Sequence, residues 1–122
     1  MRAIICGGRD FWDRERAFAW FDEIHGREGI RTVISGCARG GDRLGEEWAD
    51  QKGLEVQRYP AQWERYGKAA GLRRNQQMLD YGKPDLVIAL PGGRGTRDMI
   101  DRATAAGVRV ICPALDDVES AW

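Results

Sequence analysis

Three glycine clusters are the residues of this sequence whose type and spacing could bind a ligand. Eight of the 16 glycines belong to them: Gly7, Gly8, Gly36, Gly40, Gly41, Gly92, Gly93 and Gly95. Each cluster follows an apolar run and leads toward a segment of helical period. Glycine lets the backbone approach a ligand closely, and the helix beyond offers unpaired N–H groups and the positive end of its dipole. The pattern predicts an anionic, phosphorylated ligand.

Polar side chains beside the glycines could complete such a site. Arg9 and Arg39 extend from the first two turns, where they either pair with a phosphate or remain solvated. Asp42 stands at a helix start, where it either caps the helix or contacts a ribose hydroxyl or a water. The predicted ligand-binding residues are Gly7, Gly8, Arg9, Ser35, Gly36, Arg39, Gly40, Asp42, Asn75, Gly92, Gly93, Gly95 and Thr96.

The elements that would position these residues are strands alternating with helices. Five apolar runs without polar alternation read as parallel strands buried on both faces: residues 3–6, 32–35, 56–59, 85–90 and 108–112. Four segments of helical period lie between them, and we expect Gly53 to end the second helix and Thr96 to cap the last. The sequence therefore predicts an α/β, Rossmann-like three-layer domain with a parallel sheet of about five strands.

Length and composition support one domain. The chain has 122 residues, of which 43% are hydrophobic and 31% charged, so it is too apolar for a disordered segment. We expect a single domain over residues 1–113 and a C-terminal tail over 114–122. Lys and Arg number 19 against 19 Asp and Glu, and this zero net charge lacks the field that drives non-specific nucleic-acid binding.

Several kinds of chemistry do not fit the sequence. Cys6, Cys37 and Cys112 are widely spaced and odd in number, so we expect reduced core residues, with no disulfide framework and no metal site. No apolar run is long enough for a signal peptide or a membrane span, so we expect a cytoplasmic location and no membrane partner. GxGxxG and P-loop motifs are absent, and His25 lies away from the glycine turns, which disfavours a hydrolytic triad.

Taken together, the motifs resemble a known family. They are residues 7–10 (GGRD), 33–44 (VISGCARGGDRL), 69–79 (AAGLRRNQQML) and 91–96 (PGGRGT). In this order they resemble the YspA, cpYpsA-related branch of the SLOG superfamily, over nearly the whole chain. The resemblance implies a Rossmann-like fold that binds nucleotides or nucleotide-derived ligands such as ADP-ribose relatives, in nucleotide signalling or phage–host conflict.

A first alternative comes from the lonely-guy enzymes, which are phosphoribohydrolases. Their PGGxGTxxE motif is similar to residues 91–99, and their arginine falls on Arg74. The motif glutamate falls on Met99, which cannot accept a proton. Asp98 is adjacent but about 100° around the helix. Under this alternative the protein is a nucleotide-processing hydrolase with an altered motif, and Arg74 and Asp98 are its candidate catalytic residues.

A second alternative comes from DNA-processing protein A, whose SGxAxGID loop is similar to residues 35–42. That family binds single-stranded DNA. A basic rim could serve this purpose here, formed by Arg39, Arg43, Arg73, Arg74 and Arg94. Trp63 or Tyr66 could then stack on bases. The zero net charge makes nucleic acid the weaker hypothesis.

Our leading expectation is a domain that binds a nucleotide or an ADP-ribose-like ligand without a cofactor. The glycines of residues 92–95 and Thr96 would hold a phosphate, Arg74 would add charge, and Gly36 and Gly40 would admit the sugar. Trp63 and Tyr66 would either cover the ligand or dock on the sheet. The partner is then a nucleotide-derived small molecule, and a homodimer stays open.

Overall fold

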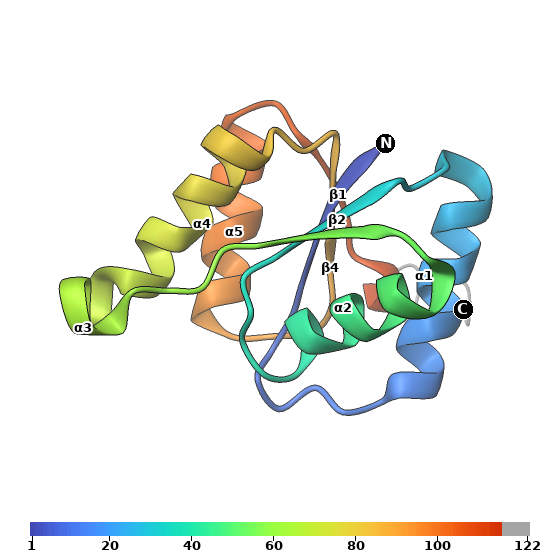
Figure 1. Cartoon of the computed structure of the whole chain (residues 1–122), viewed down its shortest axis with the longest axis horizontal. Helices are drawn as coiled ribbons and strands as arrows, with labels where there is room; N and C mark the ends of the chain where they lie inside the picture. The colour runs from blue at the N-terminus through green and yellow to red at the C-terminus, as the bar shows by residue number, and fades with distance from the viewer. Residues whose placement is uncertain (116–122) are drawn as a thin grey trace.

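The protein folds as one parallel β-sheet covered by helices on both faces (Figure 1). The computed structural model describes residues 1–115. Its elements, in chain order, are β1 (Arg2–Cys6), α1 (Arg14–Glu28), β2 (Thr32–Ser35), α2 (Gly41–Lys52), β3 (Glu55–Arg58), α3 (Trp63–Tyr66), the 3₁₀ turn η1 (Gly67–Ala69), α4 (Ala70–Gly82), β4 (Leu86–Ala89), α5 (Arg94–Ala105) and β5 (Arg109–Ile111). The predicted α/β three-layer, Rossmann-like fold is confirmed.

The sheet has the strand order β3-β2-β1-β4-β5, and every pair is parallel. Ala3 of β1 is in register with Val33 of β2 and with Leu86 of β4, so β1 is the central strand. The chain moves outward from β1 to β3 and then returns to β4 on the other side. Because ligands of such sheets bind where the strand order reverses, the loops after β1 and β4 mark the expected crevice.

Apolar runs form the strands because the sheet is covered on both faces. Residues of β2 and β4 are buried throughout, whereas the edge strands β3 and β5 carry exposed residues. The five predicted strands are all present. The range of β2 is the predicted one, and the ends of the other strands differ from the predicted ranges by at most one residue.

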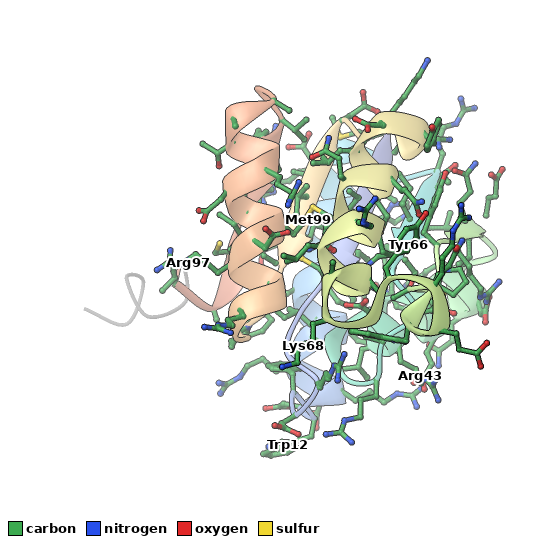
Figure 2. The ribbon with its side chains drawn as sticks, turned by 90° about the vertical axis from the view of Figure 1, so that its left-hand side faces the viewer. Trp12, Arg43, Tyr66, Lys68, Arg97 and Met99 are labelled. Carbon is green, nitrogen blue, oxygen red and sulfur yellow. The ribbon has the colours of Figure 1, made fainter. Side chains whose placement is uncertain are left out.

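Two clusters of buried side chains fill the layers. Ile5 and Val33 point to the face covered by α1 and α2, where they meet Phe21 and Trp48. The opposite face is covered by α4 and α5, and Met99 is fully buried there between them (Figure 2). His25 is half-buried, and its ring lies edge-on to that of Trp48.

Helix ends depart from prediction at one position. Gly53 has φ 70° and ends α2 as expected. Thr96 does not cap α5, because the helix begins at Arg94 with Gly93 as its N-cap. The backbone of residues 94–96 already has helical geometry, so Thr96 lies inside the first turn. Its side chain is buried beside Gly92.

The end of the chain is described only as far as Leu115. Ala114 packs against the α1–α2 side of the core, and residues 116–122 of the predicted tail lie outside the described residues. Cys6 is buried, Cys37 and Cys112 are half-buried, and none of the three forms a disulfide within residues 1–115. Within residues 1–115, no helix combines the length and apolar character needed to cross a bilayer.

Helix α2 packs on β1 through a glycine. A Cβ at Gly45 would lie 2.7 Å from Cγ2 and 2.8 Å from Cβ of Ile5, which is closer than real contacts allow. The contact fixes the height of α2 above the sheet. Since α2 begins directly after the second glycine cluster, this packing also fixes the position of that loop.

Alanine substitutions at two helical glycines test this close packing. Gly45→Ala should lower the free energy of unfolding by about 1–3 kcal/mol, because α2 must move away from Ile5. Gly26→Ala, at an exposed position of α1 where a Cβ meets nothing within 4 Å, should raise it by about 0.5–1 kcal/mol. Urea denaturation followed by circular dichroism measures both, and equal effects would contradict the packing argument.

Candidate ligand-binding cleft

A cleft of about 920 Å³ opens at the carboxyl ends of β1 and β4. Its walls are the loop after β1, the start of α2, the α3–α4 segment and the start of α5. The predicted site residues that line it are Gly7, Gly8, Arg9, Asp42, Arg74, Asn75, Gly92, Gly93, Gly95 and Thr96. A smaller cavity of about 390 Å³ adjoins it and is lined by Gly36 and Arg39. Arg9, Trp63 and Arg74 line both spaces.

The glycine loops are in direct backbone contact with one another. The N–H of Gly41 donates to the carbonyl oxygen of Gly8 at 3.0 Å, and the N–H of Gly8 donates to that of Pro91 at 2.9 Å. Gly40 has φ 79°, and a Cβ on it would lie 2.1 Å from the Gly8 oxygen. A Cβ on Gly92 would lie 2.6 Å from the Gly8 nitrogen. No other residue type fits these loops at this spacing.

The glycines of the cleft therefore divide into two groups. Gly7, Gly8, Gly40 and Gly92 lie against other loops, so close packing accounts for their type, and Gly40 lines neither cavity. A Cβ on Gly93 or Gly95 would meet nothing within 4 Å. These two glycines are exposed at the start of α5.

The start of α5 presents backbone donors to the cleft. Gly93 is its N-cap and has no side chain that could accept a hydrogen bond from the first turn. Helix geometry gives the N–H groups of Arg94, Gly95 and Thr96 no partner within the helix. These groups and the helix dipole together favour a negatively charged ligand.

Arg74 is a buried cation on the opposite wall. It is 9% exposed, and it comes from the first turn and a half of α4. Its Nη1 donates to the carbonyl oxygen of Gly36, and its Nε donates to Oδ1 of Asn75 at 3.1 Å. These bonds fix the plane of the guanidinium. No ion pair among residues 1–115 includes Arg74, so its charge remains available to an anion.

Asp42 lies close to Arg74 at the base of the cleft. A Cβ on Gly36 would lie 2.6 Å from Nη1 of Arg74 and 2.8 Å from Oδ2 of Asp42, so a glycine is needed where the two charged groups converge. Asp42 is 5% exposed, and its Oδ2 accepts from the N–H of Ala38 at 3.3 Å. It lies inside α2, whose N-cap is Gly40, so the bond reaches back to the preceding loop.

Burial determines the protonation of Asp42. Desolvation raises the pKa of its carboxyl from 3.8 to about 6, while the Arg74 charge and the N–H groups of Ala38 and Gly7 lower the pKa by smaller amounts. The Glu46 charge raises it slightly further. Asp42 is thus a carboxyl that changes charge close to neutral pH inside the cleft.

Asp98, the second candidate catalytic residue, lies elsewhere. Its Oδ2 accepts from Nδ2 of Asn75 at 2.9 Å and from Nε of Arg102 at 2.8 Å, and Arg102 also donates to Gln76. The network ties α4 to α5. Asp98 lines a separate groove along α5, so the structure does not bring it into one cavity with Arg74.

Comparison of the amino-acid sequence with those of known proteins assigns the chain to a family. The sequence model of the YspA, cpYpsA-related SLOG family matches residues 1–66, which is β1 to α3. The chain belongs to this SLOG family. It is also 36% identical over 121 residues to the Gene 61 protein of Mycobacterium phage D29, a match that covers 91% of this chain and 95% of that protein. The second similarity extends beyond α3 into α4 and α5.

Four predicted ligand-binding residues of this SLOG domain lie outside the main cleft: Ser35, Gly36, Arg39 and Gly40. Ser35 is fully buried, where its hydroxyl donates to Glu46 at 2.6 Å and accepts from the N–H of Cys37 at 3.1 Å. Arg39 is exposed and pairs with Asp10 at 3.3 Å. Ser35 points away because the side chains of a strand alternate between the two faces.

The SLOG cleft also contains residues that the sequence did not single out. Trp12, which is 82% exposed, and Lys68 of η1 both line it, and Figure 2 shows them at the end of the molecule where α5 begins. Trp63, which the sequence did single out, also lines the cleft, and the Arg9 guanidinium lies 5.5 Å from its ring centre. Tyr66 lies outside the cleft between Arg65 and Arg73. The signal in the sequence was aromatic and basic residues in loops flanking the glycine turns.

The pKa of Asp42 predicts a pH-dependent stability. A carboxyl whose pKa is raised by folding favours the folded state at low pH, and this contribution is lost as pH rises through about 4 to 6. Asp42→Asn should therefore match the wild type below about pH 4 and exceed its unfolding free energy by on the order of 3 kcal/mol at about pH 7. Urea denaturation at several pH values measures the difference. A constant difference across this range would contradict the raised pKa.

Proposed function

We propose that this SLOG domain binds a nucleotide or an ADP-ribose-like ligand in the cleft. The observation that carries the proposal is the pairing of two anion-binding features across one cavity. The start of α5 provides backbone donors on one wall, and the buried guanidinium of Arg74 lies on the other. A phosphate between them receives hydrogen bonds from both walls.

Details of the α5 loop support a phosphate in that place. The open space at Gly93 and Gly95 leaves room for oxygen atoms next to the N–H groups of the first turn. The Thr96 hydroxyl lines the same wall. Lys68 and Arg94 add positive charge at the rim, which attracts an anion from solution.

The remaining space suits a sugar and a base. The cleft volume of about 920 Å³ lies within the usual range for small-ligand sites. Trp63, which is 49% exposed, offers an aromatic face at the mouth, where stacking on a base contributes about 0.5–1.5 kcal/mol beyond burial. The cleft suits a single strand of DNA less well. The Tyr66 ring lies outside the cleft between two arginines, and the carboxyl groups of Asp10, Asp13 and Asp42 line the cleft.

A charge placed at the start of α5 tests the proposal without disturbing the fold. Gly95→Asp fits the open space, and an acidic residue in the first turn suits the helix dipole, so stability should be unchanged or higher. The same carboxylate repels a phosphate. Dissociation constants from isothermal titration with nucleoside mono- and diphosphates and ADP-ribose should rise at least about tenfold.

The matched control is Gly26→Asp, which adds the same charge at an exposed position of α1 with equal room. It should leave binding unchanged, because Gly26 lies near the end of α1, about 20 Å along the helix from Asp13, the N-cap that lines the cleft. Lack of binding by the wild type to every member of the panel at millimolar concentration would refute the proposed function.

A further inference from the structure

Asp42 differs from the other carboxylates around the cleft. Asp10 has a side chain that is 96% exposed and pairs with Arg39, and Asp13 caps α1 by accepting from the N–H of Arg16 at 3.1 Å. Asp98 is held by Asn75 and Arg102. Asp42 is buried, and no ion pair among residues 1–115 includes it. It is a carboxyl group placed, with little access to water, in a cleft whose other features attract anions.

The charged and titratable groups that face Asp42 come from four elements. Arg74 of α4 lies on the far side of Gly36. Glu46 is one turn along α2, but Arg58 and the Ser35 hydroxyl already bind its two oxygens at 2.7 and 2.6 Å. Two thiols also face Asp42: Cys6 at the end of β1 and Cys37 in the loop after β2. Burial raises the pKa of both thiols, so they stay neutral. Arg74 is therefore the one uncompensated charge beside Asp42 in the described part of the chain.

An ionised Asp42 and a bound phosphate would compete for this single cation. Two negative groups sharing one site cannot both ionise without a large cost, so the weaker acid takes a proton. The conjugate acid of a phosphodiester-type anion is a far stronger acid than a carboxylic acid, so the phosphate stays ionised. Asp42 is consequently the group that protonates, and as a neutral acid it has an O–H to donate to a ligand oxygen.

We propose that Asp42 holds the anionic ligand as a neutral carboxylic acid, so that a molecule with an ionised Asp42 takes up one proton when it binds. This inference rests on the proposed function and adds a role for a residue on the opposite wall from α5. Arg74 then keeps its full charge for the phosphate. Affinity follows the protonation of Asp42, and the cleft binds anions more tightly in mildly acidic solution than in alkaline solution.

The sign follows from linkage. Free Asp42 has a pKa of about 6, and an anion beside it raises that pKa further. Between the two pKa values the complex holds one more proton than the free protein. The dissociation constant should therefore rise by about tenfold per pH unit in this interval.

The test uses two probes whose own charge is constant from about pH 5 to about pH 8, ADP-ribose and inorganic sulfate. Titrating the full chain with each probe at several pH values should give a dissociation constant that rises with pH. Repeating one titration in buffers of different ionisation enthalpy should show uptake of one proton. A dissociation constant that does not change with pH, with no proton uptake, would overturn the inference while leaving the proposed function intact.

Asp42→Asn is the decisive variant, because the amide is uncharged, has a donor and keeps an oxygen for the N–H of Ala38. It should bind both probes at about pH 8 at least tenfold more tightly than the wild type, with no pH dependence. Asp50→Asn, on the exposed face of the same helix, should keep the wild-type pH dependence. Weaker binding by Asp42→Asn at every pH would show that the ionised carboxylate contacts the ligand and would overturn the inference. If neither probe binds the wild type, the inference is overturned, and if the nucleotide panel also fails to bind, the proposed function is refuted with it.

Discussion

The backbone contact between the loops after β1 and β2 is the constraint on which the cleft depends. The Gly8 oxygen accepts from the N–H of Gly41, and the absence of a side chain at Gly40 lets the two loops touch. A third loop joins them through the bond from Gly8 to Pro91. Because β1 is the central strand, its loop is the one that both neighbours can reach. The three loops at the floor of the cleft are therefore joined by peptide groups rather than by side chains.

Two charged groups, Arg74 and Asp42, are buried beside these loops and have lost most of their contact with water. Arg74 reaches across from α4 to the Gly36 oxygen, and Asp42 meets it at the same glycine. Burying two such groups costs free energy unless hydrogen bonds replace the lost water, and here carbonyl and N–H groups of the loops replace part of it. The pKa of Asp42 stays raised because these hydrogen bonds and the Arg74 charge offset only part of the free-energy cost of burying its charge.

The fold was largely predictable from the sequence, whereas the purpose of single residues was not. Unbroken apolar runs indicated buried parallel strands, and segments of helical period between them indicated the helices that cover the sheet. The glycine clusters indicated the carboxyl-terminal edge of the sheet, where the cleft lies. They could not show that Gly40 serves loop packing while Gly95 faces open space, because that depends on distances between segments far apart in the chain. The partners of Asp98 were hidden for the same reason.

The two sides of the cleft, the β1 and β2 loops and the α4–α5 pair, are held by different kinds of bond, so they differ in how they can move. The β1 and β2 loops are joined by backbone hydrogen bonds, which fix their separation. The α4–α5 side is joined through the long side chains of Asn75, Asp98, Arg102 and Gln76, which can change rotamer. Moving the β1 and β2 loops apart would break backbone hydrogen bonds, whereas a small displacement of α4 relative to α5 would need side-chain rotations only.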